Sequence, residues 1–383
     1  MNVTKTTVLL QDSSLSKQTQ NFFCAACLML VVPAAGAFAE DSVSNSTEDS
    51  SQAKKPVESR NAVPMGIFGA DTPGANKLAV KIMPIFANYA GQLIGSKGVS
   101  SQYVVLTTPT YSNPTQLMRV VPQDVQVSGQ NTIINYGVTD RLTAIITASI
   151  IQKQLSALTF FGETSGVPLG ASYTGTKGFA DLTTSAAYKI YDDGNHRVQI
   201  SSGFAYPLSQ DTQNIHLFQA DGFYSNERAF YSLQPGSRTF DYLPGIVYVA
   251  HHADWSWGLS YRGRIPLANN PQGWRFGDLY EFNSWLGYNI GSNLSSTVRL
   301  SNTLQGAIRG HDPQISGASV PTNPNYYGGF MSEIYGGLGI DGGIMGHQEL
   351  SIEIESGVPL YQDLNGPQIR KNWQSGMAIK VKM

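Results

Sequence analysis

Cysteine and charge are both scarce in this chain of 383 residues. The 2 cysteines, Cys24 and Cys27, lie within the first forty residues, a segment that we expect to be removed on export. The mature chain would then have no disulfide, no thiol nucleophile and no thiolate metal site. Charged residues make up 14% of the sequence, well below the roughly 25% of soluble globular domains. The formal net charge is −2, so nothing indicates a nucleic-acid partner, which would need a basic face.

Long apolar runs are also missing. After residue 40 there is no uninterrupted apolar segment long enough to cross a membrane as a helix. Aromatic residues and glycine are plentiful, with 19 Tyr, 16 Phe and 39 Gly. Few charges, many aromatic side chains and no apolar helix together favour a membrane β-barrel, in which apolar and polar residues alternate along each strand.

The first 39 residues have the three parts of an export signal. Lys5 and Lys17 supply positive charge, residues 22–32 form a short apolar core, and Ala37-Phe38-Ala39 matches the small-x-small cleavage pattern. An apolar core of about 11 residues is too short to span a bilayer as a helix. We therefore expect a signal peptide over 1–39.

The segment after the signal has a different composition. It is rich in Ser, Asp, Glu and Lys and has few large apolar residues up to residue 60. Such a composition cannot bury enough apolar surface to fold alone. We expect residues 40–75 to be a disordered periplasmic leader and residues 76–383 to form an outer-membrane β-barrel.

From residue 76 onward the apolar residues recur with a period of two, which is typical of strands. In one clear case Val298 and Leu300 alternate with Arg299 and Ser301. We predict about twelve strands, each long enough for a tilted strand to cross a bilayer. They are expected at 76–89, 122–137, 141–153, 178–190, 196–206, 239–250, 254–265, 278–290, 294–306, 328–340, 346–358 and 371–383.

Short and long connections alternate between these strands. Tight turns are expected near residues 139–140, 192–195, 251–254, 291–293 and 341–343. Long connections are expected at 90–121, 154–177, 207–238, 266–277, 307–327 and 359–370. Outer-membrane barrels have short periplasmic turns and long outer loops, whereas a soluble β-sandwich has no reason to separate loop lengths in this way. The fold class is thus all-β: a closed antiparallel up-and-down transmembrane barrel of about 12 strands.

Several motifs support this assignment through resemblance. They are Tyr136-Gly137-Val138-Thr139-Asp140-Arg141-Leu142, Asp241-Tyr242-Leu243-Pro244-Gly245, Trp255-Ser256-Trp257-Gly258 and the stretch from Gly357 to Gln368. The chain resembles, from about residue 61 to its end, the family of outer-membrane transporters named for the meta-pathway of phenol degradation. The resemblance implies an outer-membrane barrel and a role in transport. Some members carry dense Met and His and occur in copper-handling contexts, but this chain has no His before His196, which argues against a copper role.

Charged residues recur on the polar faces of the predicted strands. An Arg or Lys that faces lipid at mid-depth costs roughly 2–4 kcal/mol, so these side chains should face the lumen. Two interpretations remain open: a polar lining of a pore, or internal salt bridges that fill a narrow barrel. The candidate lumen-facing residues are Lys77, Lys81, Arg197, Arg262, Arg264, Glu281, Arg299, Glu333, Glu353, Glu355 and Lys380.

No catalytic motif accompanies these charges. A Ser–His dyad, as in barrel phospholipases, needs the two side chains within hydrogen-bond reach, and His347 and Ser351 are too far apart along a strand. We expect no enzyme activity, cofactor or metal. The expected role is passive passage of a small aromatic or hydrophobic solute across the outer membrane, with membrane lipid and the solute as partners. The alternative is a non-conducting barrel whose outer loops bind a partner or surface ligand.

Overall fold

Antiparallel strands dominate this computed structural model, which describes residues 62–383. The predicted signal peptide and residues 40–61 of the predicted leader lie outside the described residues. Within the described part, one sheet contains eleven wall strands, two further strands being attached to it. The wall strands are β1 (Leu78–Gly95), β3 (Val120–Gly137), β4 (Leu142–Phe160), β5 (Pro168–Asp192), β6 (His196–Tyr206), β10 (Gly245–His252), β11 (Trp255–Pro266), β13 (Leu279–Ile290), β14 (Leu294–Gln305), β16 (Gly329–Asp341) and β17 (Leu350–Lys382).

The sheet closes on itself because β10 pairs with both β11 and β6. β17 passes along the wall twice. Its first part, up to Leu364, pairs with β16, and its second part pairs with β1. The hydroxyls of Ser356 and Ser375 lie 2.7 Å apart, as expected if the two parts run side by side. Counting β17 twice, the wall has about twelve crossings, so the predicted closed antiparallel barrel is confirmed.

The period of two in the sequence becomes two different faces of the wall. On β1, Ala79, Lys81 and Met83 are buried, whereas the intervening Ile82 and the later Phe86 are 42% and 48% exposed. Large apolar side chains point outward in the same way from the other wall strands. An apolar outer face is stable next to lipid but not next to water. None of the described helices is long and apolar enough to cross a membrane.

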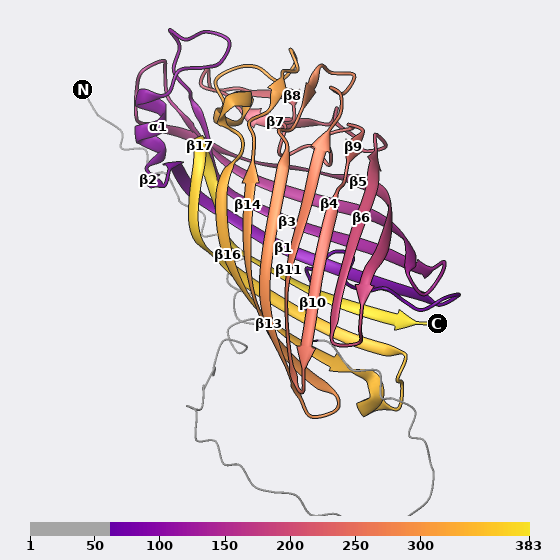
Figure 1. The fold of residues 1–383 in the computed structure, drawn as a ribbon. Helices are drawn as coiled ribbons and strands as arrows, with labels where there is room; N and C mark the ends of the chain where they lie inside the picture. The colour runs from indigo at the N-terminus through magenta and orange to yellow at the C-terminus, as the bar shows by residue number, and fades with distance from the viewer. Residues whose placement is uncertain (1–61) are drawn as a thin grey trace, which may run out of the picture. The chain divides into compact units, whose positions relative to one another are not determined.

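Short turns lie at one end of the barrel, which we call the turn end. They join β3 to β4, β5 to β6, β10 to β11 and β13 to β14, while η4 (Gly342–Met345) lies between β16 and β17. The opposite, loop end carries the longer connections. These include β2 (Lys97–Val99), α1 (Ser101–Thr107), β7 (Asn214–Phe218), β8 (Tyr224–Arg228), β9 (Asp241–Tyr242), β12 (Trp274–Arg275), β15 (Arg309–Gly310), η2 (Val320–Thr322) and η3 (Pro324–Tyr326). Figure 1 shows α1, β7 and β8 gathered at this loop end.

Three predicted segments differ from the structure. The connection predicted at 154–177 is short, because β4 and β5 continue to Phe160 and from Pro168. The connection predicted at 359–370 is absent, since β17 doubles back near Leu364. The strand predicted at 239–250 is divided into β9 and β10 around Pro244, which has no backbone N–H for the ladder.

β4 and β5 extend beyond their predicted ends because the loops pack against them. Leu155 and Ala157 of β4 are buried against Ile215 and Leu217 of β7. The hydroxyl of Thr159 donates to the carbonyl of Phe218 at 2.5 Å. Apolar contacts and hydrogen bonds of this kind stabilise the ladder past the segment that shows simple alternation.

A substitution on the outer face tests whether that face meets lipid. Leu259 lies mid-way along β11 and is 59% exposed. In lipid vesicles Leu259→Arg should lower the free energy of unfolding by about 2–4 kcal/mol, because a guanidinium would be placed in hydrocarbon. Equilibrium urea unfolding measures the change. Leu259→Ile is the control and should behave like the native chain. Equal stability of Leu259→Arg and the native chain would contradict a lipid-facing position.

Candidate functional site

The first described residues, 62–71, lie inside the barrel, and we call them the plug. The ammonium of Lys81 on β1 donates to the carbonyl oxygen of Met65 at 3.1 Å. The hydroxyl of Ser256 on β11 donates to the carbonyl oxygen of Ala62 at 2.7 Å. Because β1 and β11 lie in different parts of the ring of strands, a segment that contacts both lies in the lumen.

Further hydrogen bonds join the plug to the wall on other sides. The backbone N–H of Gly66 donates to Glu355 Oε2 at 3.0 Å. The guanidinium of Arg197 on β6 donates to the carbonyl oxygen of Ala70 at 2.8 Å. The predicted disorder of residues 62–75 is therefore wrong. These residues fold because the lumen supplies hydrogen-bond partners that the isolated segment does not have.

The plug also has an apolar face. Ile67 and Ala70 are buried against Val247, Val249 and Trp285 of the wall. This side of the lumen is thus packed with side chains in the way that a protein core is. Met65 is buried in a second cluster, with Met83 and Ala378. Together with the hydrogen bonds, these contacts hold the plug to the wall along its length.

Two glycines of the wall leave the space that the plug occupies. A Cβ atom added to Gly287 would collide with the carbonyl oxygen of Ala62. A Cβ atom added to Gly376 would lie 2.7 Å from Met65 Cε, closer than non-bonded carbon atoms approach. The wall is therefore shaped to accept the plug at residues from strands far apart in sequence.

One buried group of ion pairs lies along β14, β16 and β17. Arg299 Nε contacts Glu355 Oε1 at 2.7 Å, and both side chains are almost fully buried. Lys371 Nζ contacts Glu333 Oε1 at 2.7 Å, again with both side chains buried. Tyr335 lies between these pairs: its hydroxyl donates to Glu333 at 3.0 Å, and its ring lies 4.0 Å from Arg299 Cζ. The charges of this group neutralise one another inside the lumen.

A second group of ion pairs joins the plug to the wall. Lys380 Nζ contacts Asp71 Oδ1 of the plug at 2.9 Å and Glu353 Oε1 at 3.7 Å. Lys81 Nζ contacts Glu353 Oε2 at 3.2 Å. Burial of the Asp71 carboxylate would by itself raise its pKa, but Lys380 and then Lys81 outweigh this effect and hold the pKa below its ordinary value. Because the pKa of Asp71 is lowered in the folded chain, its ionised carboxylate stabilises the fold at every pH above the ordinary carboxyl pKa. This stabilisation is lost only as the pH falls below that ordinary pKa. The ion pair of Asp71 with Lys380 therefore persists at neutral pH.

A third group joins Arg264 both to a neighbouring strand and to a strand farther along the sheet. Arg264 of β11 contacts Asp181 of β5 at 2.5 Å and Asp241 of β9 at 2.6 Å. Since β6 and β10 separate β5 from β11 in the wall, the contact with Asp181 crosses the curved interior of the barrel. The Arg264 guanidinium therefore links β5, β9 and β11 on the inner face of the wall.

The loops narrow the lumen further at the loop end. Lys153 Nζ of β4 donates to the carbonyl oxygens of Ser232 and Gln234, both at 2.7 Å. The hydroxyl of Thr176 on β5 donates to the carbonyl oxygen of Leu233. Phe230 and Leu233 are buried in the same apolar cluster as the loop strand β7. A loop segment thus packs against the wall as the plug does nearer the turn end.

The predicted lumen residues have different environments. Most take part in the three ion-paired groups, and Arg197 binds the plug backbone. Arg262 pairs with Glu281 at 3.6 Å and its side chain is 45% exposed. Lys77 precedes β1 at the turn end and is exposed, so it belongs to none of these groups. The predicted residues found in the three groups are Lys81, Arg264, Arg299, Glu333, Glu353, Glu355 and Lys380.

Four charged partners were not predicted from the sequence: Asp71, Asp181, Asp241 and Lys371. Asp181 and Asp241 lie at inward-facing positions of predicted strands, so the alternation of those strands could have identified them. Lys371 has the same parity as the exposed Trp373 and Met377, and it faces inward because of a register shift of β17 against β1, so alternation would have placed it on the outer face. Asp71 could not be identified, because the plug has no strand periodicity.

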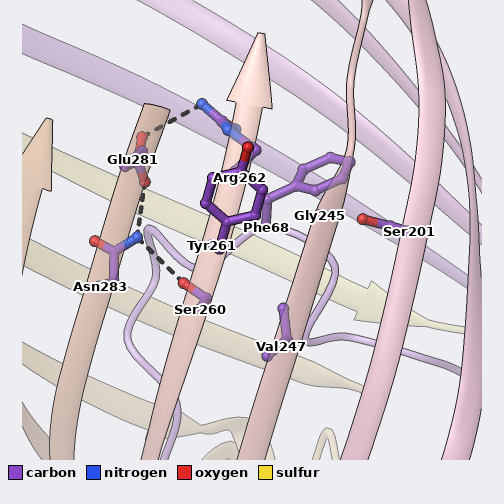
Figure 2. Close-up of a pocket in the computed structure, with 9 residues that line it drawn as sticks. All are labelled: Phe68, Ser201, Gly245, Val247, Ser260, Tyr261, Arg262, Glu281 and Asn283. Carbon is purple, nitrogen blue, oxygen red and sulfur yellow. Dashed lines mark hydrogen bonds and ion pairs between the residues drawn. The ribbon is translucent and has the colours of Figure 1, made fainter. Parts of the chain in front are cut away.

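A small pocket lies where the plug meets β6, β10, β11 and β13 (Figure 2). Phe68 of the plug forms one side, and the Arg262 Cζ atom lies 5.7 Å from the centroid of its ring. The Asn283 amide donates to Glu281 at 2.8 Å and to the Ser260 hydroxyl at 3.2 Å. The pocket thus combines an aromatic ring with a polar wall. The remaining lining residues are Ser201, Gly245, Val247 and Tyr261.

No protein-family model and no curated protein matches the chain. Among solved structures, the chain is similar to an outer-membrane channel from Pseudomonas putida F1, with a TM-score of 0.52 and 13% identity over 83% of this chain and 99% of the other. It is also similar to the Pseudomonas putida toluene transporter TodX (TM-score 0.35, 10% identity, 81% and 90% covered). A third similarity is to the β-domain of the Bordetella autotransporter BrkA (TM-score 0.41, 12% identity, 80% and 99% covered).

The first of these similarities shows that the two chains share a fold. The other two scores are too low to support an inference. Because no family model matches, membership of the family named for the meta-pathway of phenol degradation stays a prediction.

The buried pair of Glu333 and Lys371 provides a test of the ion-paired lumen. Glu333→Gln should lower the free energy of unfolding by about 3–5 kcal/mol, because Lys371 would remain buried without its carboxylate. Equilibrium urea unfolding in lipid vesicles measures this loss. In a double-mutant cycle, Glu333→Gln with Lys371→Met should cost less than the sum of the two single changes.

The exposed pair of Glu349 and His347 at the turn end is the matched control, since both side chains are more than half exposed. Glu349→Gln should leave the stability almost unchanged, because an exposed ion pair contributes little. If Glu333→Gln had an equally small effect, or the double-mutant cycle were additive, the ion pair would not stabilise the barrel.

Proposed function

We propose that this protein is a channel of a bacterial outer membrane that carries a small, largely apolar solute through a lumen narrowed by its own plug. The observation that carries the proposal is the contrast between the two faces of the closed wall. Apolar side chains cover the outer face, whereas the inner face carries paired charges and a segment of the chain itself. A soluble barrel would not expose its apolar face in this way.

The proposed location and orientation follow from the same contrast. An apolar outer face requires lipid, and a β-barrel that spans a membrane must be closed, as this one is. Together with the predicted signal peptide, this supports insertion in the outer membrane with the turn end in the periplasm. The plug would then occupy the periplasmic half of the lumen.

The lumen is partly filled and most of its charges are paired, which favours a small solute over a large or highly charged one. The plug and the loop segment near Phe230 both occupy the interior. Most charged side chains of the inner wall already have partners, so they offer little attraction to ions. A small, largely apolar solute is in keeping with the aromatic and apolar side chains that line parts of this lumen.

One observation favours the alternative function. The plug is joined to the wall by hydrogen bonds, ion pairs and apolar contacts, which are the properties of a permanent core. A barrel filled in this way would not conduct, and its loops would then carry the function, by binding a partner at the cell surface.

Conductance of a plug-deleted variant distinguishes these functions. The full mature chain should conduct weakly in a planar lipid bilayer. Deletion of residues 62–71 should raise its single-channel conductance several-fold, because the removed segment occupies the lumen. The matched control is a deletion of ten residues from the polar segment before the plug, residues 44–53, which should leave the conductance unchanged. Heat-dependent mobility on a gel shows which variants have folded.

Two outcomes would count against the channel. Correctly folded native and plug-deleted proteins that both fail to conduct would favour the loop-binding alternative. An equal conductance of the native and plug-deleted proteins would mean that the plug does not narrow the path.

A further inference from the structure

The pocket beside Phe68 has properties of a binding site for one class of solute (Figure 2). Its walls come from the plug and from β6, β10, β11 and β13, so it lies on the inner side of the barrel. The inference drawn from it rests on the proposed channel function, because it concerns a solute held within the same lumen. It depends on three features: a bare part of the wall, an arginine with spare donors and an aromatic ring.

The wall is bare at the point where β10 begins. Gly245 has no side chain, and a Cβ atom placed on it would collide with the hydroxyl of Ser201. Pro244 precedes this position and interrupts the strand between β9 and β10. The small residues Gly245 and Ser201 therefore line the pocket together with Phe68, and a larger side chain at Gly245 would displace the Ser201 hydroxyl.

Arg262 differs from the other arginines that face the lumen. The guanidinium of Arg299 makes hydrogen bonds to Glu355 and Asn283, and that of Arg264 makes hydrogen bonds to two carboxylates. Arg262 has a single ion pair with Glu281, at 3.6 Å, which is longer than a hydrogen bond. Its side chain is 45% exposed, compared with 6% for Arg299. Most of its five N–H donors are thus open to a solute.

The neighbours of Arg262 explain why its charge is not neutralised by a closer contact. Glu281 accepts a hydrogen bond from Asn283 at 2.8 Å. Asn283 is in turn held by Arg299, which donates to Asn283 Oδ1 at 2.8 Å. This connected set of hydrogen bonds fixes Glu281 on β13. Arg262 extends from β11 toward that carboxylate but stays 3.6 Å from it, and its Cζ atom lies 5.7 Å from the centroid of the Phe68 ring (Figure 2).

A guanidinium and an aromatic ring side by side match a particular kind of solute. Guanidinium groups bind planar carboxylates through two parallel hydrogen bonds. An aromatic ring packs well against another ring at its edge or face. We propose that this pocket binds a small aromatic acid, with Arg262 pairing with the carboxylate and Phe68 contacting the ring. A neutral hydrocarbon would gain nothing from Arg262, and an aromatic amine would be repelled by it.

Binding of benzoate to the purified mature barrel tests this proposal. Isothermal titration in detergent at pH 7 should show saturable binding to the native chain. Arg262→Gln should weaken the binding by at least about tenfold, because hydrogen bonds to a charged group are lost. Arg262→Lys keeps the charge but not the paired donors, and should give an intermediate affinity. Phe68→Leu should weaken binding by a smaller factor, since the aromatic contact alone is removed.

Arg238 provides a matched control in the same chain. It lies in a loop, its side chain is 44% exposed, and it contacts Asp211 at 3.7 Å. Exposure and pairing are therefore almost the same as for Arg262, but Arg238 does not line the pocket. Arg238→Gln should bind benzoate as the native chain does. Benzylamine and benzyl alcohol, which have the same ring without the carboxylate, should not displace benzoate.

Several results would overturn the proposal. Equal benzoate affinity of the native chain and Arg262→Gln would exclude Arg262 as the carboxylate ligand. Displacement of benzoate by benzyl alcohol would show that the ring alone is recognised. Since titration in detergent does not require transport, a native chain that conducts but does not bind benzoate would refute the aromatic-acid site and leave the channel intact. A native chain that binds benzoate but never conducts would refute the channel and leave the site intact.

Discussion

The low polarity of the surroundings forces the charged side chains of this barrel wall to find partners inside it. A charge that faces lipid is costly, and a charge in a narrow lumen is only partly solvated. Arg299 with Glu355 and Lys371 with Glu333 show the result: both pairs are short and almost fully buried. The inner wall is thus held together by ion pairs between strands, in addition to the backbone ladder.

The plug depends on the same constraint. Lys81 and Arg197 donate to its backbone carbonyl oxygens, and Lys380 pairs with its Asp71. Wall cations that would otherwise lack sufficient acceptors find them on the plug. The segment therefore completes the network of the wall, which explains how ten residues without a strand or helix of their own can have a defined position. Its removal would leave cations without acceptors, but it would also admit water that could solvate them.

Much of the wall could be predicted from the sequence, because a period of two is a local property. The range predicted for β6, 196–206, agrees with the structure, and the alternation around Arg299 places it correctly on the inner face. The choice of its partner could not be predicted. Glu281 and Glu355 both lie on nearby inner faces, and the pairing depends on register, which a bulge after Ser332 shifts. The plug could not be predicted either, since its contacts join residues as distant as Ala62 and Ser256.

Whether a charged side chain is fully or only partly paired determines how it can contribute to the selection of a solute in such a lumen. Paired charges such as Arg299 and Glu355 nearly cancel beyond their own contact, so they contribute little to the potential along the lumen. A partly paired charge such as Arg262 acts at longer range, because the low-dielectric wall confines its field. Arg262 lies next to Phe68, which belongs to the plug. Any movement of residues 62–71 would therefore shift the ring beside the guanidinium and change which solute is selected. In this barrel, the element that narrows the path therefore also forms part of the pocket at which a solute would be recognised.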